Sequence, residues 1–408
     1  MAARPQGIDL FDPDLYLGGP PHETFALLRR EAPVYRNPRA DAPPYWAVTR
    51  YRDVISVSRD WVTFSSERRG VLLREPSDEA METLRLLLLN MDPPRHTKVR
   101  GLVNKGFTPR VVDRLSESIR RICAEIVDAV GERGECDFVS EVAAELPLQV
   151  IAELLGVPQE DRHQVFEWSN TMIGSDDPEW QRSPEEGQAA ALEMYGYANE
   201  LALARKESPR DDLVSVLMRA EIDGERLTEM EFDVFFLLLA VAGNETTRNL
   251  ISGGMLALVE HPDQRRRLQE DHSLIDSAVE EMLRWVTPVL QFQRTAQRDT
   301  EIADQPVGEG DRVALYYVSA NRDESVFESA DQFDVGRAPN DHLTFGGGGP
   351  HFCLGASLAR VQIKLMFQEL LRRLPDLELN GPPRRLRSNL VNGIKAMPVR
   401  FTPVRAKA

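Results

Sequence analysis

A run of four glycines, followed by one cysteine and a long helical pattern, constrains this chain more than any other stretch. It reads Phe345-Gly-Gly-Gly-Gly-Pro-His-Phe-Cys353-Leu-Gly355. Glycines carry no Cβ atom, so this backbone can turn tightly and lie flat against another group. Residues 356–374 contain no Gly or Pro and repeat leucine and valine at helical spacing, which predicts a helix that begins just after Cys353.

The position of Cys353 before a helix indicates its chemistry. The first turn of a helix has a partial positive charge and free N–H groups, which favour a thiolate over a thiol. A thiolate held by a bare glycine loop suits a metal whose flat macrocycle must come close to the backbone. A glycine-rich turn followed by a buried structural cysteine is the alternative, and the stretch alone leaves it open.

The segment resembles the haem-binding loop of cytochrome P450 monooxygenases, whose pattern is Phe-Gly-x-Gly-x-His-x-Cys-x-Gly. The resemblance implies that Cys353 is the axial thiolate ligand of the iron in haem b, and that Phe345, Gly346 and Gly355 form the loop around it. Phe345 lies eight residues before Cys353, whereas seven is usual in the family. The extra residue falls in the glycine run, where an insertion is most easily absorbed.

Residues 235–249 form the second informative stretch. Its first half is apolar on every face, which predicts a helix through the middle of the core. Glu245 then interrupts it, and an acid in a core helix is costly unless it has a partner or a function. Gly243 removes bulk, and Thr246 can bond to an upstream carbonyl. The alternative is a helix whose second half turns polar because it reaches the surface.

This stretch also matches the Ala-Gly-x-Glu/Asp-Thr motif of the P450 family. The resemblance implies that Ala242 contacts the haem, and that Gly243 leaves room for dioxygen. It further implies that Thr246 supports oxygen activation, while Glu245 helps to relay protons.

Two pairs of residues are weak signals by themselves. His96 and Arg100 share a helix face, which could bind an anion or face solvent. The resemblance implies that these two residues bind haem propionates together with Arg294 and His351. Glu281 and Arg284 are spaced like a surface ion pair, and the resemblance implies instead a buried structural network that Arg337 completes.

The periodicity predicts a mainly α protein with a small β lobe. We predict helices at 24–31, 51–59, 111–131, 138–155 and 159–173, strands at 46–49 and 313–318, and a hairpin at 387–395. The break after residue 173 suits either a mobile cover over a pocket or an ordinary connection between helices. The resemblance implies a P450 fold in one domain over residues 1–408, with the haem between the central helix and the cysteine loop. The β-rich lobe would combine residues 35–70, 286–320 and 385–402.

Composition limits the partners and the location of the protein. The net charge of −16 argues against non-specific binding of nucleic acid. Three cysteines without paired spacing indicate a reducing compartment, and we expect the cytoplasm. The start, MAARPQGIDLF, has no apolar core, and the longest apolar run, 234–242, is too short to span a bilayer. We expect a monomer.

The resemblance implies hydroxylation of a small apolar substrate with dioxygen. Electrons would come from a ferredoxin and a ferredoxin reductase, because the chain has no flavin or iron–sulfur segment. We predict a basic landing patch for the ferredoxin made of Lys98, Arg100, Lys105, Arg360 and Lys364. We predict an apolar substrate pocket formed by Leu88, Val241, Val289, Leu290 and Val391.

Three features resemble the P450 branch that hydroxylates sterol side chains and methyl-branched lipids. They are the long glycine run, residues 242–249, and the pair of segments 385–388 and 392–395. A steroid or terpenoid substrate, hydroxylated at a terminal side-chain carbon, is therefore expected. The alternatives are a tailoring P450 for a macrolide, polyketide or other natural product, a haem sensor without turnover, and a lipid-binding module that has lost its haem.

Overall fold

The computed structural model describes residues 7–40, 42–74, 76–181, 183–222 and 225–404, and only the backbone of 105, 222 and 225. Helices dominate the described part, as the sequence predicted. The longer ones are α1 (His22–Glu31), α2 (Tyr51–Arg59), α4 (Arg95–Val103), α5 (Pro109–Gly131), α6 (Glu145–Leu155), α7 (Arg162–Ile173), α8 (Pro184–Glu207), α10 (Glu229–Glu260), α11 (Pro262–Glu270), α12 (Ile275–Val286) and α14 (Ala356–Arg373). The shorter ones are α3 (Asp78–Leu84), α9 (Leu213–Met218) and α13 (Tyr317–Ala320).

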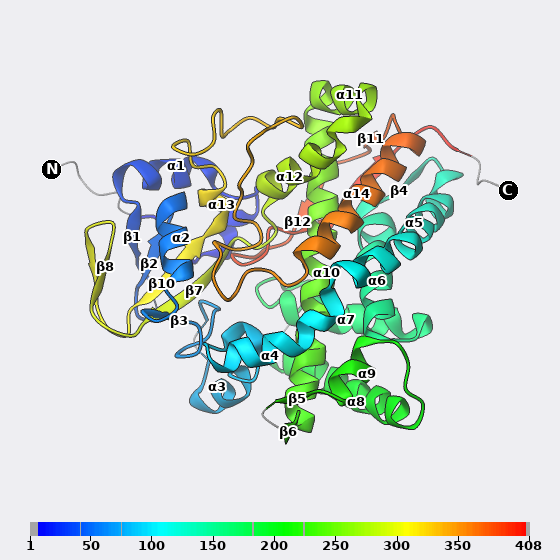
Figure 1. Cartoon of the computed structure of the whole chain (residues 1–408). Helices are drawn as coiled ribbons and strands as arrows, with labels where there is room; N and C mark the ends of the chain where they lie inside the picture. The colour runs from blue at the N-terminus through cyan, green and yellow to red at the C-terminus, as the bar shows by residue number, and fades with distance from the viewer. Residues whose placement is uncertain (1–6, 41, 75, 182, 223–224, 405–408) are drawn as a thin grey trace.

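Helix α10 runs through the middle of the molecule (Figure 1). A capping box starts it: the Thr228 hydroxyl accepts from the Glu231 N–H at 3.2 Å, and the Glu231 carboxylate accepts from the Thr228 N–H at 2.9 Å. Phe235 and Phe236 are buried, so the apolar first half of the helix does pass through the core. The helix continues for 32 residues, and its polar stretch therefore also lies inside the protein.

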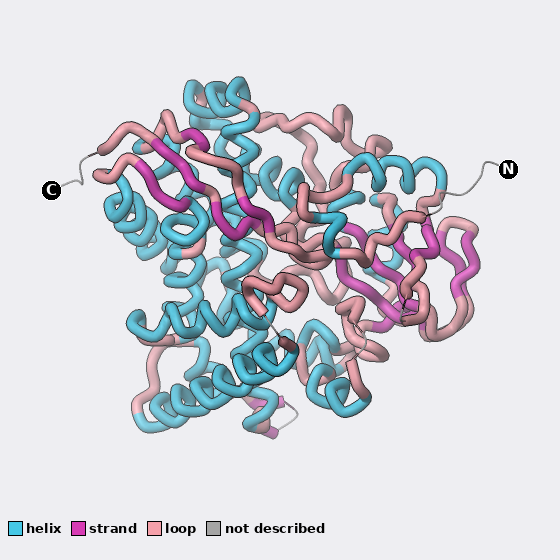
Figure 2. The backbone as a smooth tube through the Cα atoms, turned by 180° about the vertical axis from the view of Figure 1, so that it is seen from behind, coloured by secondary structure: helices cyan, strands magenta, loops and turns pink. Residues whose placement is uncertain are grey.

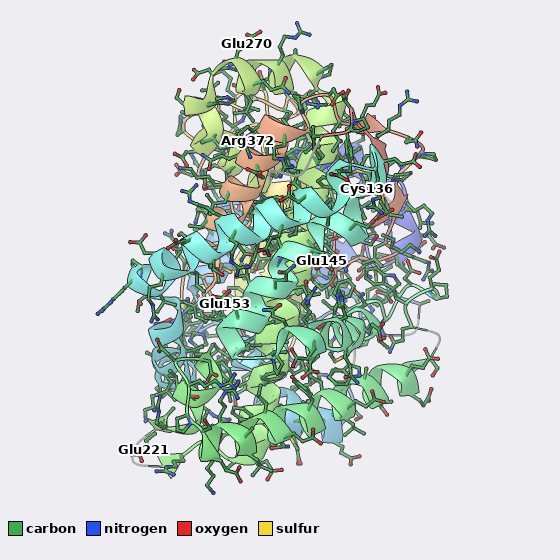
Figure 3. All side chains as sticks on the ribbon, turned by 90° about the vertical axis from the view of Figure 1, so that its right-hand side faces the viewer. Cys136, Glu145, Glu153, Glu221, Glu270 and Arg372 are labelled. Atoms are coloured by element: carbon green, nitrogen blue, oxygen red, sulfur yellow. The ribbon has the colours of Figure 1, made fainter. Side chains whose placement is uncertain are left out.

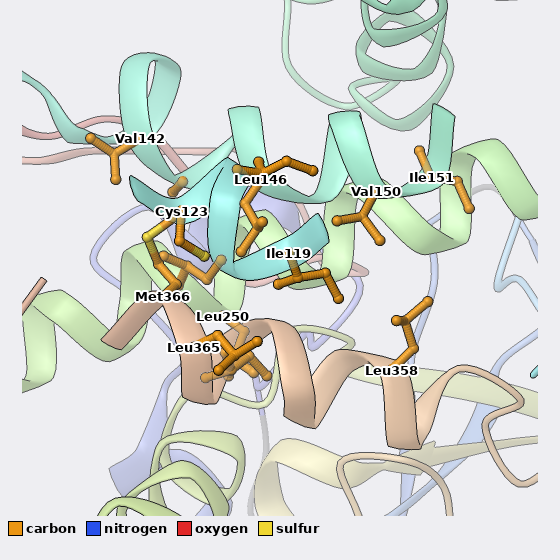
Figure 4. Packing of buried hydrophobic residues seen from close by; sticks show 14 of the residues in the cluster. Ile119, Cys123, Val142, Leu146, Val150, Ile151, Leu250, Leu358, Leu365 and Met366 are labelled. Atoms are coloured by element: carbon orange, nitrogen blue, oxygen red, sulfur yellow. The ribbon is translucent and has the colours of Figure 1, made fainter. Parts of the chain in front are cut away.

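The main core lies where α5, α6, α10 and α14 pack together. Figure 4 shows Cys123 of α5 among Leu146 of α6, and Leu365 and Met366 of α14. Burial raises the pKa of the Cys123 thiol to about 12, so this cysteine is protonated at neutral pH and packs as a small hydrophobe.

The β lobe is a five-stranded sheet built from two distant parts of the chain. Its order is β1-β2-β10-β7-β3, with β1 (Val34–Asn37), β2 (Tyr45–Val48), β3 (Phe64–Ser65), β7 (Gln291–Ala296) and β10 (Arg312–Tyr316). Strands β2 and β10 are parallel, and Trp46 lies opposite Val313. All other neighbours in this sheet are antiparallel. Because segments 34–65 and 291–316 interleave, no cut through the chain separates the lobe, which favours a single domain.

The last strands differ from the prediction. The sheet β11-β14-β4 joins β11 (Glu378–Leu379) and β14 (Pro398–Arg400) to β4 (Glu135–Asp137), beside α5 and away from the five-stranded sheet (Figures 1 and 2). The predicted hairpin at 387–395 is mostly its loop, since the paired strands are β12 (Arg384–Arg385) and β13 (Ile394–Ala396). The helix predicted over 138–155 divides into a π-helical turn, Val139–Ala143, and α6. The remaining pairs are β5 (Glu221–Ile222) with β6 (Glu225–Arg226), and β8 (Thr300–Ile302) with β9 (Gln305–Val307).

Among the described residues, the structure has no helix that combines the length and the apolar character needed to cross a membrane. Glu270, where α11 ends, and Glu221 in β5 lie at opposite ends of the molecule in Figure 3.

Candidate active site

The glycine run folds into a tight loop against the end of α2. Gly346, Gly348 and Gly349 have φ values of 100°, 88° and 77°, which side-chain-bearing residues rarely adopt. A Cβ atom on Gly349 would also come within 2.8 Å of the Ser58 carbonyl oxygen. Glycine is therefore needed here both for backbone conformation and for close approach. Three of the four glycines share the turn, so the extra residue in the run is absorbed by the whole loop.

Cys353 closes this loop, because its N–H donates to the Phe345 carbonyl at 2.9 Å. The thiol lies deep in the molecule, yet it has open surface, because that surface faces an internal cavity. Burial raises the pKa of the thiol and outweighs the backbone N–H groups of Gly355 and Ala356 and the charge of Arg100, all of which lower it. The start of α14 alone does not make a thiolate here, and a metal ion in place of the proton would do so.

The cavity lies between α10 on one side and the cysteine loop with the start of α14 on the other. Most of its lining is aliphatic or aromatic, and among the described residues that line it none is Asp or Glu. Many of the predicted site residues meet here: Leu88, His96, Arg100, Ala242, Gly243, Thr246, Val289, Arg294, Phe345, Gly346, His351, Cys353 and Gly355. Phe292, Tyr317 and Leu358, which the sequence did not single out, line it too.

Three predicted pocket residues do not line the cavity. Leu290 lies just before β7 and is fully buried in the cluster of the N-terminal segment, not at the cavity. Val391 forms an isolated β-bridge with Val289, so it lies beside that residue, but it does not line the cavity itself. Val241 is half-buried on another face of α10 from Ala242 and Leu238. The spacing of these residues in the sequence did not show which of them face the cavity.

Four basic side chains, two from α4, one from β7 and one from the cysteine loop, converge on one wall of the cavity. The rings of His96 and His351 lie 4.4 Å apart between centroids, and Arg294 is buried beside them. Burial, together with the charge of the neighbouring arginines, lowers the pKa of His96 to about 4 and that of His351 to about 2. Burial also lowers the pKa of Arg100 and of Arg294. The Nδ1 atom of His96 has no hydrogen-bond partner.

This group of donors fits an anion. The two arginines carry positive charge into a wall with no acid, and neighbours of like charge disfavour protonation of the histidines. A ligand with carboxylates would supply the missing acceptors, including one for His96. A flat macrocycle with two propionates, lying on the cysteine loop, satisfies the chemistry of both walls.

Gly243 of α10 is needed for the packing of a neighbouring helix. A Cβ atom on Gly243 would come within 2.8 Å of the Ile151 side chain, so the glycine lets α6 approach α10 beside the cavity. One turn further, the Thr246 hydroxyl donates to the Ala242 carbonyl at 2.9 Å. This is the backbone bond that the sequence predicted for Thr246, and it holds the hydroxyl at the cavity wall.

Glu245 faces away from the cavity that Gly243 and Thr246 line. It is buried, and its Oε2 atom accepts a hydrogen bond from Arg248, which is buried as well. Burial raises the pKa of Glu245 and outweighs the opposing effect of Arg248. Sequence reasoning missed Arg248 as a partner. Its signal was its spacing of three residues from the acid within one helix, which also describes countless surface pairs.

Glu281 and Arg284 of α12 form a buried network rather than a surface pair, since both side chains are fully buried. Arg284 makes five hydrogen bonds, two to the Glu281 carboxylate and three to the carbonyls of Asn321, Ala330 and Gln332. Arg337 donates to the same carboxylate at 3.0 Å. The network ties α12 to the loop that leads to the cysteine segment.

The fold is typical of one class of protein. So is the cavity, which has a cysteine on one wall and the Thr246 hydroxyl of α10 on the other. The family model described as Cytochrome P450 matches residues 148–395. The chain belongs to the cytochrome P450 family and is a monooxygenase, as its resemblance predicted. Members of this family contain haem iron, and they use dioxygen, redox partners and lipophilic substrates.

Particular relatives place it further within the family. The chain is 47% identical to the steroid C26-monooxygenase of Rhodococcus jostii, over 97% of this chain and 85% of that protein. It is 42% identical to the methyl-branched lipid omega-hydroxylase of Mycobacterium bovis, over 93% of this chain and 90% of that protein. A Mycobacterium marinum cytochrome P450 in complex with pseudoionone has a similar structure, with a TM-score of 0.92 and 39% identity over 98% of this chain and all of that one. The predicted likeness to this branch is confirmed.

Proposed function

We propose that this P450 hydroxylates the terminal carbon of an aliphatic chain, carried by a steroid or by a methyl-branched lipid. The observation that carries the proposal is the cavity, whose lining includes Leu88, Val150, Phe235 and Val289 together with Thr246 and has no acid among the described residues. Such a lining suits a hydrocarbon chain. The names of the two curated relatives both refer to chain-terminal positions.

We propose the following roles for the site residues. Cys353 would ligate the haem iron, and His96, Arg100, Arg294 and His351 would hold the propionates. The haem, when bound, supplies the activation of dioxygen for the balanced reaction RH + O2 + 2e⁻ + 2H⁺ → ROH + H2O. The aliphatic wall orients the substrate and excludes water. The Thr246 hydroxyl lies beside the reacting centre. Glu245 supplies protons from the face of α10 that points away from the cavity.

We propose that the haem is the b form, which has no covalent attachment. Of the three cysteines, Cys123 is buried between α5 and α14, and Cys136 lies in β4, so only Cys353 lies at the cavity. A thioether link therefore has no donor. Acidified organic solvent should extract the haem completely, and pigment retained by the protein would contradict the b form.

Ligand titration followed by product analysis tests the substrate class. Cholest-4-en-3-one and a methyl-branched fatty acid should each displace axial water and shift the Soret band, and mass spectrometry should locate the new oxygen at the chain terminus. Oxidation of a macrolide or polyketide only, with no shift by either probe, would favour a tailoring enzyme. A shift without any product under coupled reduction would favour a sensor.

Replacing Thr246 by alanine should divert electrons from product to peroxide. The variant keeps the apolar wall, so the dissociation constant of the substrate should change little. Product per NADH should fall by about tenfold or more, since a positioned proton donor typically contributes about 10²–10⁴-fold. Thr246→Ser retains the hydroxyl and is the matched control. Equal coupling in the alanine variant and the native enzyme would remove Thr246 from the mechanism.

We propose a ferredoxin as the electron donor, docked beside the start of α14. The predicted patch is less basic than its sequence suggests, because Glu280 binds Arg360 at 2.6 Å and Asp276 binds Lys364 at 2.6 Å. The side chain of Lys105 lies outside the described residues. Arg360 also stacks on Phe345, 4.5 Å from the ring centroid, so changing it would disturb the cysteine loop.

Lys364 is therefore the better residue for testing the docking of the donor. Lys364→Glu would place a second acid beside Asp276, and reduction by an acidic ferredoxin should slow by about tenfold at low salt, because steering is lost. The difference should shrink as ionic strength rises. Lys206→Glu on α8 is the matched control. Stopped-flow measurement of haem reduction decides, and equal rates in both variants would exclude this docking face.

We also propose a monomer in the cytoplasm. The cysteines are all free, which suits a reducing compartment. The large exposed apolar side chains belong to several separate elements, such as Leu17, Val62 and Leu192, and single exposed hydrophobes are ordinary on monomers. Light scattering of the purified protein tests the monomer, and a dimer would refute it. Fractionation of the native cells tests the location, and a protein that sediments with the membranes would refute it.

A further inference from the structure

The pair formed by Glu245 and Arg248 has contacts that reach well beyond α10. Only one carboxylate oxygen of Glu245 is bonded, and its Oε1 atom is buried without a partner. An acid held at one oxygen and free at the other can bind or release a proton at the free oxygen. The position of the carboxylate therefore depends on what holds Arg248.

Arg248 is held by α7 and by the turn that follows α7. Its Nη1 atom donates to the Asn170 side-chain oxygen at 2.7 Å. The guanidinium also lies 4.9 Å from the ring centroid of Trp180 and 5.5 Å from that of Phe166. These contacts stabilise a buried cation whose one carboxylate partner among the described residues is Glu245.

Trp180 is itself held in place by the turn. A Cβ atom on Gly174 would overlap the side chain of Trp180, so the glycine at the end of α7 makes room for this ring. The Trp180 N–H donates to the carbonyl of Asp177 at 3.0 Å. The buried Asp177 carboxylate pairs with Lys395 of β13 at 2.8 Å. The turn therefore holds the Trp180 ring in a fixed position beside Arg248.

We propose that Arg248 is a positioning residue, which α7 anchors through Asn170 and Trp180 so that Glu245 is held where it can deliver protons. None of Asn170, Trp180 and Arg248 lines the cavity, so their effect passes through Glu245 and not through the substrate. Coupled turnover therefore depends on α7 lying in the position described here. The inference rests on the proposed function only in taking Glu245 as a proton donor.

Asn170→Ala removes the hydrogen bond between α7 and Arg248 with the least disturbance, because it leaves the buried ion pair of Glu245 and Arg248 intact. Thr171→Ala is the matched control, since this hydroxyl bonds only to the Glu167 carbonyl of its own helix at 3.0 Å. With cholest-4-en-3-one as the probe, Asn170→Ala should lower product per NADH about threefold or more, with a matching rise in peroxide and a larger solvent isotope effect. The dissociation constant should stay within about twofold, since substrate binding is not touched.

A measurement without turnover separates this inference from the proposed function. The infrared band of the Glu245 carboxyl group, assigned by its loss in Glu245→Gln, should shift in Asn170→Ala and stay in place in Thr171→Ala. An unchanged band in Asn170→Ala would show that Asn170 does not position Glu245. Unchanged coupling in that variant would show that this positioning does not matter for turnover. If the native enzyme makes no product from the sterol, the proposed substrate fails, while the band still decides on Arg248.

Arg248 variants extend the test. Arg248→Gln alone leaves a buried acid without a counter-ion, and its failure to fold would say nothing about positioning. The double variant Glu245→Gln/Arg248→Gln removes both charges and should fold. Adding Asn170→Ala to it should then have no further effect on coupling, because the positioned acid is gone. An additional fall in coupling would show that Asn170 acts by another route and would overturn the proposal.

Discussion

Replacing Cys353 by serine should abolish hydroxylation and remove the thiolate signature from the absorption spectrum of the reduced, carbon monoxide-bound protein. The cysteine sulfur lies at the cavity wall and is the sole thiol there among the described residues. A serine hydroxyl has no comparable tendency to lose its proton and bind iron as an anion. The measurement is the carbon monoxide difference spectrum, combined with the haem content and product formation.

Cys136→Ser is the matched control for this experiment. Cys136 is half-buried in β4, and burial raises the pKa of its thiol to about 12, so it is an ordinary protonated cysteine away from the cavity. Its variant should have native haem content, spectrum and turnover. A Cys353→Ser protein with a native spectrum would show that another residue ligates the iron, and it would remove the basis of the proposed site.

Replacing Arg284 by methionine should destabilise the protein by about 3–5 kcal/mol, which is the usual cost of removing one partner of a buried ion pair. The change deletes five hydrogen bonds at once. It also leaves Glu281, which is fully buried, with Arg337 as its remaining cation. Urea unfolding followed by circular dichroism measures the change in the free energy of unfolding.

An exposed ion pair provides the comparison for Arg284. Arg400 binds Glu378 at 2.6 Å with both side chains more than half exposed, so Arg400→Ala should cost less than about 1 kcal/mol. Adding Glu281→Gln to Arg284→Met should not restore the lost stability, because Arg337, whose side chain is also buried, would then lose its carboxylate partner. A loss below about 1 kcal/mol for Arg284→Met would show that the network adds little to stability.

Local patterns predicted much of the fold. The helix over 51–59 agrees with α2 in both bounds, and the helices after Cys353 and over 111–131 agree with α14 and α5 within two residues. These segments combine a clear apolar stripe with breakers at their ends, so local propensity and tertiary packing favour the same structure. The strand predicted at 313–318 ends instead at Tyr316, because residues 317–320 turn into the short helix α13.

The sequence could not show which way side chains face across the molecule. Leu290 and Val289 are neighbours of similar character just before β7, and only the folded backbone decides that Val289 lines the cavity while Leu290 is buried in another cluster. Glu245 and Thr246 differ in direction by about 100° around α10, so the acid faces α7 while the alcohol faces the cavity. Partners such as Asn170 for Arg248 come from another helix, and no local spacing records them.

The joining of segments 34–65 and 291–316 in one sheet also has a consequence for biosynthesis. As the chain leaves the ribosome, β2 has β1 to pair with, but its other edge waits until β10 has been made some 260 residues later. Contacts between such distant segments form late and slowly, and unsatisfied strand edges in the meantime are sites for misassociation. A nascent chain of this kind depends on being shielded until its second half is complete.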